Sequence, residues 1–114
     1  MSDGSDRPII GITVDATEDP TDSRTGGKLT LNWNYAQVIA DAGGVPLLIP
    51  PQADPEAIAR ILDGWLIPGG NDIDPTYWGE ELHPEAKLID EARHLQERAI
   101  YREIPTDLPV LGVC

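Results

Sequence analysis

Apolar residues gather in four short runs along the chain, separated by longer polar segments. The runs contain many β-branched residues and few polar ones, and they cover residues 8–14 (PIIGITV), 45–51 (VPLLIPP), 65–68 (WLIP) and 108–114 (LPVLGVC). An apolar run without polar alternation is typical of a strand buried on both faces of a parallel sheet. The pattern therefore predicts four strands, the last of which ends at the single cysteine, Cys114.

Apolar residues at helical spacing lie between successive runs. A first helix is predicted to end at a glycine pair and to bury Leu31, Tyr35, Val38, Ile39 and Ala42. A second helix begins at Asp54 and Pro55 and is predicted to bury Ile58, Ile61 and Leu62. A third spans about residues 90–103, with a predicted apolar face of Leu88, Ala92, Leu95 and Ala99. Residues 15–28 are rich in Asp, Thr, Pro and Gly, which predicts a loop.

Strands and helices alternate along the chain, and this order is typical of a parallel sheet with helical crossovers. We therefore predict an α/β fold with a doubly wound parallel sheet over residues 8–114, preceded by a flexible tail at residues 1–7. A parallel strand buried in a sheet needs cover, and no helix follows the last strand. We expect residues 8–114 to be the N-terminal half of a domain, completed by further chain or by a separate chain.

The balance of charge excludes some partners. The chain has 20 acidic and 8 basic residues and a formal net charge of -12, which argues against a nucleic-acid or anionic-membrane surface. No apolar run approaches the length of a membrane span, and the polar start lacks the features of a signal peptide. A single cysteine cannot form an internal disulfide. These features predict a cytoplasmic protein.

Candidate chemistry lies where the predicted strands end. Ligands of parallel α/β sheets bind beyond the carboxyl ends of the strands, and the Gly69-Gly70 pair and Cys114 both fall there. Consecutive strands are often neighbours, which would bring the glycines near the cysteine. Cys114 suits either packing or a nucleophile held at a strand end, and position alone leaves both open. Gly69-Gly70 suits a simple turn or a backbone that offers N–H groups to an oxyanion.

Other reactive side chains are weaker candidates. Asp72 and Asp74 supply too few ligands for a hard cation, so no metal site is predicted. His83 and His94 show no spacing that pairs them with the cysteine, and His94 is predicted to lie on the surface of a charged helix. The aromatic side chains are predicted to serve in packing, and they are Trp33, Tyr35, Tyr77 and Trp78.

Several segments together resemble the class I glutamine amidotransferase-like hydrolases. The segments are RPIIGIT, NYAQVIADAGGVPLLIPP, DGWLIPGGNDIDPTYWGEE and LPVLGVC. The resemblance extends over nearly all of residues 7–114, with these segments in the right order and spacing. The branch they resemble most is the γ-glutamyl-γ-aminobutyrate hydrolase family, grouped with the C26 cysteine peptidases that include γ-glutamyl hydrolases. The resemblance implies a flavodoxin-like doubly wound fold and a Cys-His-Glu triad, without a metal or organic cofactor.

The resemblance also implies roles for individual residues. Cys114 matches the nucleophile, and the Gly69-Gly70 turn matches the loop that gives one oxyanion N–H, with Gly70 the preferred donor. The expected reaction is hydrolysis of a γ-glutamyl amide through a thioester, and polyamine breakdown is the pathway it suggests. The Arg-Gly pair that usually follows the nucleophile and the triad His and Glu are absent from the 114 residues. His94 stands where related sequences usually have an acidic residue. The isolated chain is therefore expected to be inactive.

Two other functions remain open at this point. One is a glutaminase subunit that supplies ammonia to a synthase. The other is a non-catalytic α/β module that binds a small ligand or a protein partner. The expected partners of the hydrolase are a small γ-glutamyl substrate and the remainder of the same domain, and a homodimer is the default assembly among symmetric oligomers.

Overall fold

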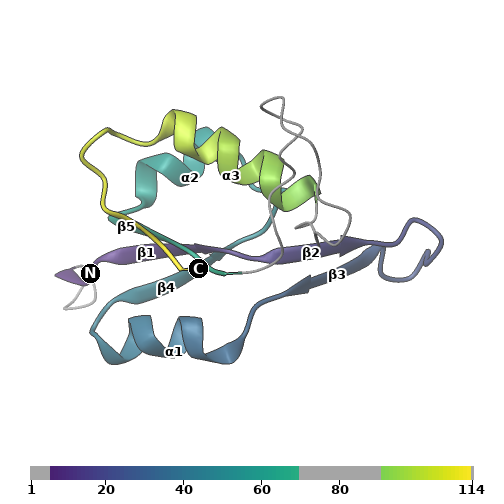
Figure 1. Cartoon of the computed structure of the whole chain (residues 1–114), viewed down its shortest axis with the longest axis horizontal. Helices are drawn as coiled ribbons and strands as arrows, with labels where there is room; N and C mark the ends of the chain where they lie inside the picture. Colours follow the sequence, from purple (N-terminus) through teal and green to yellow (C-terminus); the bar gives the residue numbers. More distant parts are fainter. Residues whose placement is uncertain (1–5, 70–90, 114) are drawn as a thin grey trace, which may run out of the picture.

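Four parallel strands form the sheet at the centre of this computed structural model, which describes residues 6–69 and 91–113 (Figure 1). Their order across the sheet is β4-β1-β5-β6. The strands are β1 (Ile9–Thr13), β4 (Val45–Ile49), β5 (Gly64–Ile67) and β6 (Val110–Gly112). All three pairings are parallel. The predicted strands and the α/β class are confirmed.

Helices cover both faces of the sheet (Figure 1). Helix α1 (Trp33–Asp41) lies on one face, whereas α2 (Pro55–Ile61) and α3 (Glu91–Glu103) lie together on the other. This division follows from the strand order. The chain moves outward from β1 to β4 and then returns across the sheet to β5 and β6. Because parallel crossovers are right-handed, reversing the direction of travel places the later helices on the opposite face.

The helix ends form as the sequence predicts. Gly43 closes α1 with a positive φ of 95°, and its N–H donates to the Ala40 carbonyl at 3.1 Å. The next N–H, of Gly44, donates to the Ile39 carbonyl at 3.0 Å. This pair of bonds is the Schellman arrangement, in which glycine takes the left-handed position without a Cβ penalty. Asp54 caps α2, because its side chain accepts the Glu56 N–H at 3.3 Å.

The main core lies between the sheet and the α2–α3 layer. Its buried side chains are Ile49, Leu62, Trp65 and Ile100. Gly11 in β1 faces this core, and a Cβ placed there would lie 2.6 Å from Ile49 Cδ1 and 2.7 Å from Leu62 Cδ2. The glycine therefore lets the two neighbouring side chains close over the central strand.

The segment predicted as a loop at residues 15–28 contains a β-hairpin instead. Strands β2 (Asp15–Glu18) and β3 (Gly27–Thr30) pair antiparallel and extend away from the sheet (Figure 1). The composition is loop-like because the hairpin is largely exposed, and only its tip is a true turn. There, Asp19 and Asp22 accept hydrogen bonds from Thr21 and Thr25, respectively.

Helix α3 buries a different face from the predicted one. Its buried residues are Arg93, His94, Gln96 and Ile100, whereas Leu95 is 46% exposed. The prediction counted only apolar residues, but polar side chains of α3 bond to the loops around the sheet. His94, predicted to lie on the surface, is 7% exposed. Ile61 and Val38 were also predicted to be buried, and they are 48% and 58% exposed.

Strand β6 is confirmed as a strand, whereas its burial was expected to need cover from further protein, and in the described residues it lacks that cover. Among the described strands it pairs with β5 and lies at one end of the strand order. Val110, Leu111 and Val113 are 39%, 64% and 40% exposed.

Replacing Gly11 with Ala should overpack the core. We expect Gly11→Ala to lower the free energy of unfolding by about 1–3 kcal/mol, as overpacked cores do. Gly112→Ala is the matched control, because a Cβ there meets no atom within 4 Å. Urea denaturation of both variants measures the difference. Equal stabilities would contradict the close packing at Gly11.

The hairpin tip should loosen in acid. The side-chain hydrogen bond from Thr21 lowers the pKa of Asp19, and that from Thr25 lowers the pKa of Asp22. A depressed carboxyl pKa stabilises the folded turn above the unfolded value of about 3.9, and this contribution disappears as pH falls through the folded value. Carboxyl ¹³C titration by NMR should give midpoints below about 3.9 for both residues. Midpoints at or above that value would show that the turn does not hold the charged forms.

Candidate functional site

The sheet has one topological switch point, between β1 and β5, where the strand order changes direction. Ligands of open α/β sheets bind at the carboxyl ends of strands beside such a point. Here β1 ends at Thr13, and β5 leads into Pro68 and Gly69. A cavity of about 50 Å³ opens at this place, lined by Thr13, Asp15, Thr30, Leu31, Asn32, Tyr35, Pro68, Gly69 and Arg93.

The segment after β5 lies directly beside the end of β6. The Val113 N–H donates to the Ile67 carbonyl at 2.9 Å. A Cβ on Gly69 would lie 3.2 Å from the Val113 carbonyl oxygen, so this position has little room for a side chain. The glycine pair and the end of the last strand were expected to be close, and the described parts of both segments are adjacent. Gly70 and Cys114 lie outside the described residues, so their roles remain predictions.

Tyr35 contacts this segment from α1, the helix on the opposite face of the sheet from α2 and α3. It stands in the first turn of α1, and its hydroxyl oxygen accepts the Gly69 N–H at 3.1 Å. The sequence predicted Tyr35 as a packing aromatic. The structure adds a polar contact at its tip, between residues 34 positions apart.

Arg93 approaches the same segment from α3. The residue is 3% exposed. Its Nη2 donates to the Pro68 carbonyl at 2.6 Å, its Nη1 to Asp15 Oδ1 at 2.6 Å and its Nε to Glu97 Oε2 at 3.0 Å. One guanidinium therefore connects the helix, the hairpin and the segment after β5.

The carboxylates around Arg93 balance its charge. Burial disfavours the charged guanidinium, but the hydrogen bond to Asp15 and the negative charge of Glu97 outweigh it, and the pKa of Arg93 is raised. Arg93 is therefore charged throughout the pH range in which a protein folds. Glu97 also accepts a hydrogen bond from the Thr13 hydroxyl, which ties the network to the end of β1.

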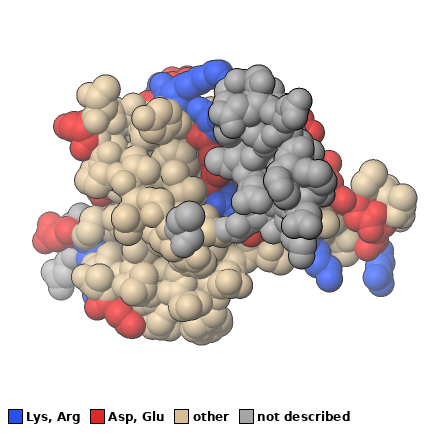
Figure 2. Space-filling model, viewed as in Figure 1, with Lys and Arg blue, Asp and Glu red and all other residues tan. Residues whose placement is uncertain are grey.

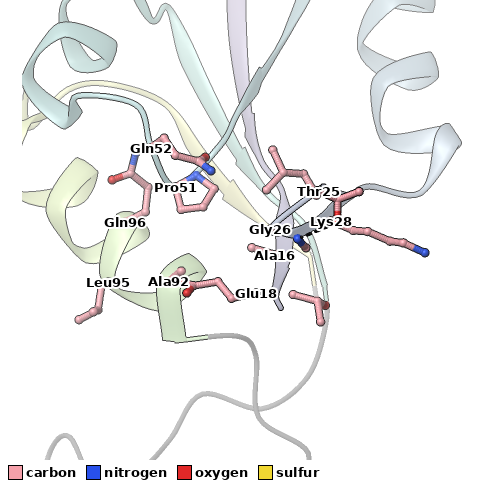
Figure 3. A pocket seen from close by; sticks show the side chains of 13 residues that line it. Ala16, Glu18, Thr25, Gly26, Lys28, Pro51, Gln52, Ala92, Leu95 and Gln96 are labelled. Atoms are coloured by element: carbon pink, nitrogen blue, oxygen red, sulfur yellow. Dashed lines mark hydrogen bonds between the residues drawn. The ribbon is translucent and has the colours of Figure 1, made fainter. Parts of the chain in front are cut away.

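A larger cavity of about 690 Å³ lies between the hairpin and the start of α3. In Figure 3, Ala92, Leu95 and Gln96 of the helix lie on one side, with Pro51 and Gln52 nearby. Gln96 Nε2 donates to the Ala53 carbonyl at 2.7 Å and to the Pro50 carbonyl at 3.2 Å, so it holds the loop after β4. This cavity does not include Gly69 among its lining residues. We therefore take the smaller cavity at the switch point as the candidate site.

Several residues singled out in the sequence lie elsewhere than predicted, and others fall outside the described residues. His94 is buried in α3 and is not the surface residue that was expected. Trp33 was predicted to pack, but it is 83% exposed at the start of α1. The remaining candidates lie outside the described residues, and they are Asp72, Asp74, Tyr77, Trp78 and His83.

Sequence reasoning missed the polar network itself, which consists of Thr13, Asp15, Arg93 and Glu97. One signal was present: Arg93 and Glu97 are oppositely charged, four residues apart and on the same helical face as Ile100. Charged pairs at this spacing are commonly exposed, as Glu56 and Arg60 are, so the alignment with Ile100 is the feature that points to the buried face. The contacts to Asp15 and Pro68 cross 78 and 25 positions and leave no local pattern.

Charges on the described surface are mixed. On the face in Figure 2, Asp and Glu occur beside Lys and Arg, without a continuous basic area. Within residues 6–69 and 91–113, no three His, Cys, Asp or Glu side chains gather closely enough to hold a metal ion. No helix in the same ranges has the length and apolar character needed to cross a membrane.

Comparisons with known proteins show a family and several relatives of this chain. The sequence model of the family described as Peptidase C26 matches residues 8–114. The chain is 35% identical to a candidate glutamine amidotransferase of Mycobacterium tuberculosis, Rv2859c, over 97% of this chain and 38% of that protein. It is 31% identical to a candidate glutamine amidotransferase-like protein of Rickettsia prowazekii, RP404, over 96% of this chain and 41% of that protein. Protein NtpR of Enterococcus hirae is 30% identical over 94% of this chain and 46% of its own length. The chain thus spans less than half the length of these curated relatives.

Removing the buried guanidinium should destabilise the fold. We expect Arg93→Met to lower the free energy of unfolding by about 3 kcal/mol, because it leaves the Glu97 carboxylate largely buried without its partner. Arg60→Met is the matched control, since Arg60 makes an exposed ion pair with Glu56 on α2, and such pairs contribute about 0–1 kcal/mol. Urea denaturation compares the two variants. Similar effects would mean that the buried network adds no more than a surface pair.

Proposed function

The chain belongs to the Peptidase C26 family, and on this basis we propose that the protein hydrolyses γ-glutamyl amide bonds with Cys114 as the nucleophile. One observation carries the proposal. The segment that leads into Gly69-Gly70 follows β5, which borders the switch point on one side and lies beside the end of β6 on the other. A nucleophile one residue beyond Val113 and a donor one residue beyond Gly69 would both continue from this pair of adjacent strand ends.

The proposed reaction has two halves. The Cys114 thiolate attacks the amide carbonyl carbon, a C–S bond forms, and the carbonyl oxygen becomes an oxyanion that accepts the Gly70 N–H. The C–N bond then breaks, and the amine leaves with a proton. Water attacks the thioester, a C–O bond forms, the C–S bond breaks, and glutamate leaves. The proton acceptor in this proposal is a histidine held by a glutamate, from sequence beyond these 114 residues.

The proposed specificity concerns the γ-glutamyl half of the substrate. The amine half is undetermined, and γ-glutamyl-γ-aminobutyrate is the test compound that the resemblance suggests. No cofactor takes part in the proposed steps. Because the acid–base pair is proposed to lie elsewhere, the isolated chain should not turn over substrate.

A second candidate function is a glutaminase that releases ammonia from glutamine. The names of two relatives favour it, since both refer to glutamine amidotransferases. Both functions use the same thioester, so they differ in the leaving group and not in the nucleophile. Rates with glutamine and with γ-glutamyl-γ-aminobutyrate, measured on the same preparation, separate the two.

Replacing the nucleophile tests the proposal. In the full-length protein, Cys114→Ala should lower glutamate release by about a thousandfold or more, because no covalent intermediate can form. Iodoacetamide should inactivate the unaltered protein in step with labelling of the peptide that contains Cys114. Thr106→Ala, a change in the segment between α3 and β6, serves as the control. Full activity in Cys114→Ala would overturn the proposal.

A further inference from the structure

A single peptide unit at the switch point is held by two side chains. The Pro68 carbonyl accepts from Arg93 Nη2 at 2.6 Å, and the Gly69 N–H donates to the Tyr35 hydroxyl at 3.1 Å. These are the two polar groups of the same peptide bond. Arg93 comes from α3 and Tyr35 from α1, so the two contacts approach from opposite faces of the sheet (Figure 1).

The orientation of this peptide matters because its second residue is a glycine. The 68–69 peptide has left the sheet, and glycine allows the chain after it a wide range of backbone angles. The two contacts hold both polar groups of this peptide and so restrict rotation of its plane. Its orientation sets the direction from which the next residue, Gly70, continues. An oxyanion donor is effective only when its N–H already points to where the charge develops.

We propose that Tyr35 and Arg93 are positioning residues for the oxyanion turn, which they orient by holding the Pro68–Gly69 peptide. The inference rests on the proposed function, since it assigns a task to residues beside that site. Neither side chain is proposed to touch the reacting atoms.

Arginine suits this task better than lysine. Its planar fork donates in three directions at once, to Pro68, Asp15 and Glu97, and these bonds fix the orientation of the guanidinium. A lysine ammonium could keep the charge but not the same three directions. The two carboxylates therefore serve to aim Arg93 at the Pro68 carbonyl.

Tyr35→Phe in the full-length protein is the sharper test, because it removes one oxygen and keeps the ring. We expect kcat for γ-glutamyl amide hydrolysis to fall by roughly ten- to a hundredfold, in the range that a misplaced oxyanion donor costs. KM should change by less than about threefold, since the donor acts in the transition state. Tyr101→Phe is the matched control, because Tyr101 is 67% exposed on α3, and its kcat should be unchanged.

Arg93→Lys is a second test variant. Its control is Arg60→Lys, on the exposed face of α2. We expect a similar loss in kcat for Arg93→Lys and none for the control. Alkylation of Cys114 by iodoacetamide should proceed within about twofold of the unaltered rate in Tyr35→Phe and Arg93→Lys. This reaction displaces iodide from a CH₂ carbon and forms no oxyanion, so it reports on the thiol and not on the turn.

The outcomes separate this inference from the proposed function. Normal kcat in Tyr35→Phe, in a protein that hydrolyses γ-glutamyl amides, would overturn the positioning role alone. Equal losses in hydrolysis and alkylation would also overturn it, because they would indicate general damage to the site. If the unaltered protein hydrolyses no γ-glutamyl amide, the proposed function fails, and the oxyanion task fails with it. Amide hydrogen exchange at Gly69 then tests what is left of the inference, the hold of Tyr35 on the Pro68–Gly69 peptide. Faster exchange in Tyr35→Phe than in Tyr101→Phe supports that hold, and equal exchange overturns it.

Discussion

The buried charge of Arg93 is the constraint on which the carboxyl edge of the sheet depends. A guanidinium in the interior loses its hydration, and this loss is tolerable only when opposite charges and hydrogen-bond acceptors surround it. Asp15 and Glu97 supply the charges, and the Pro68 carbonyl supplies a further acceptor. Each acceptor belongs to a different part of the chain. Satisfying one cation therefore fixes the hairpin, helix α3 and the segment after β5 relative to one another.

The doubly wound arrangement explains how one peptide can be reached from both sides. A peptide inside a strand bonds to its neighbouring strands, but the Pro68–Gly69 peptide lies past the end of β5. At that level the helical layers on the two faces both come within side-chain reach. Tyr35 is at the start of α1 and Arg93 near the start of α3, so each stands at the edge of the sheet where its strands end.

Much of the fold follows from local patterns, and most of the site does not. The strands, the cap at Asp54 and the glycine that ends α1 are local features, and they form as predicted. The hairpin was missed because its exposed strands have the composition of a loop. The buried face of α3 was misassigned because polar side chains occupy it. The adjacency of Gly69 and Val113 was predictable from strand order, whereas the bonds that orient the Gly69 segment join residues distant in sequence.

The central position of β1 has a consequence for how the sheet is assembled during synthesis. Among the described strands it is synthesised first, yet both of its neighbours, β4 and β5, come much later in the chain. Until Val45–Ile49 emerges, the nascent β1 has no parallel partner, and its apolar side chains have no sheet to enter. Pairing over such sequence distances is slow because each closure fixes a long stretch of flexible chain. The antiparallel hairpin, complete by Thr30, is the only β-structure in the described chain that can close before then.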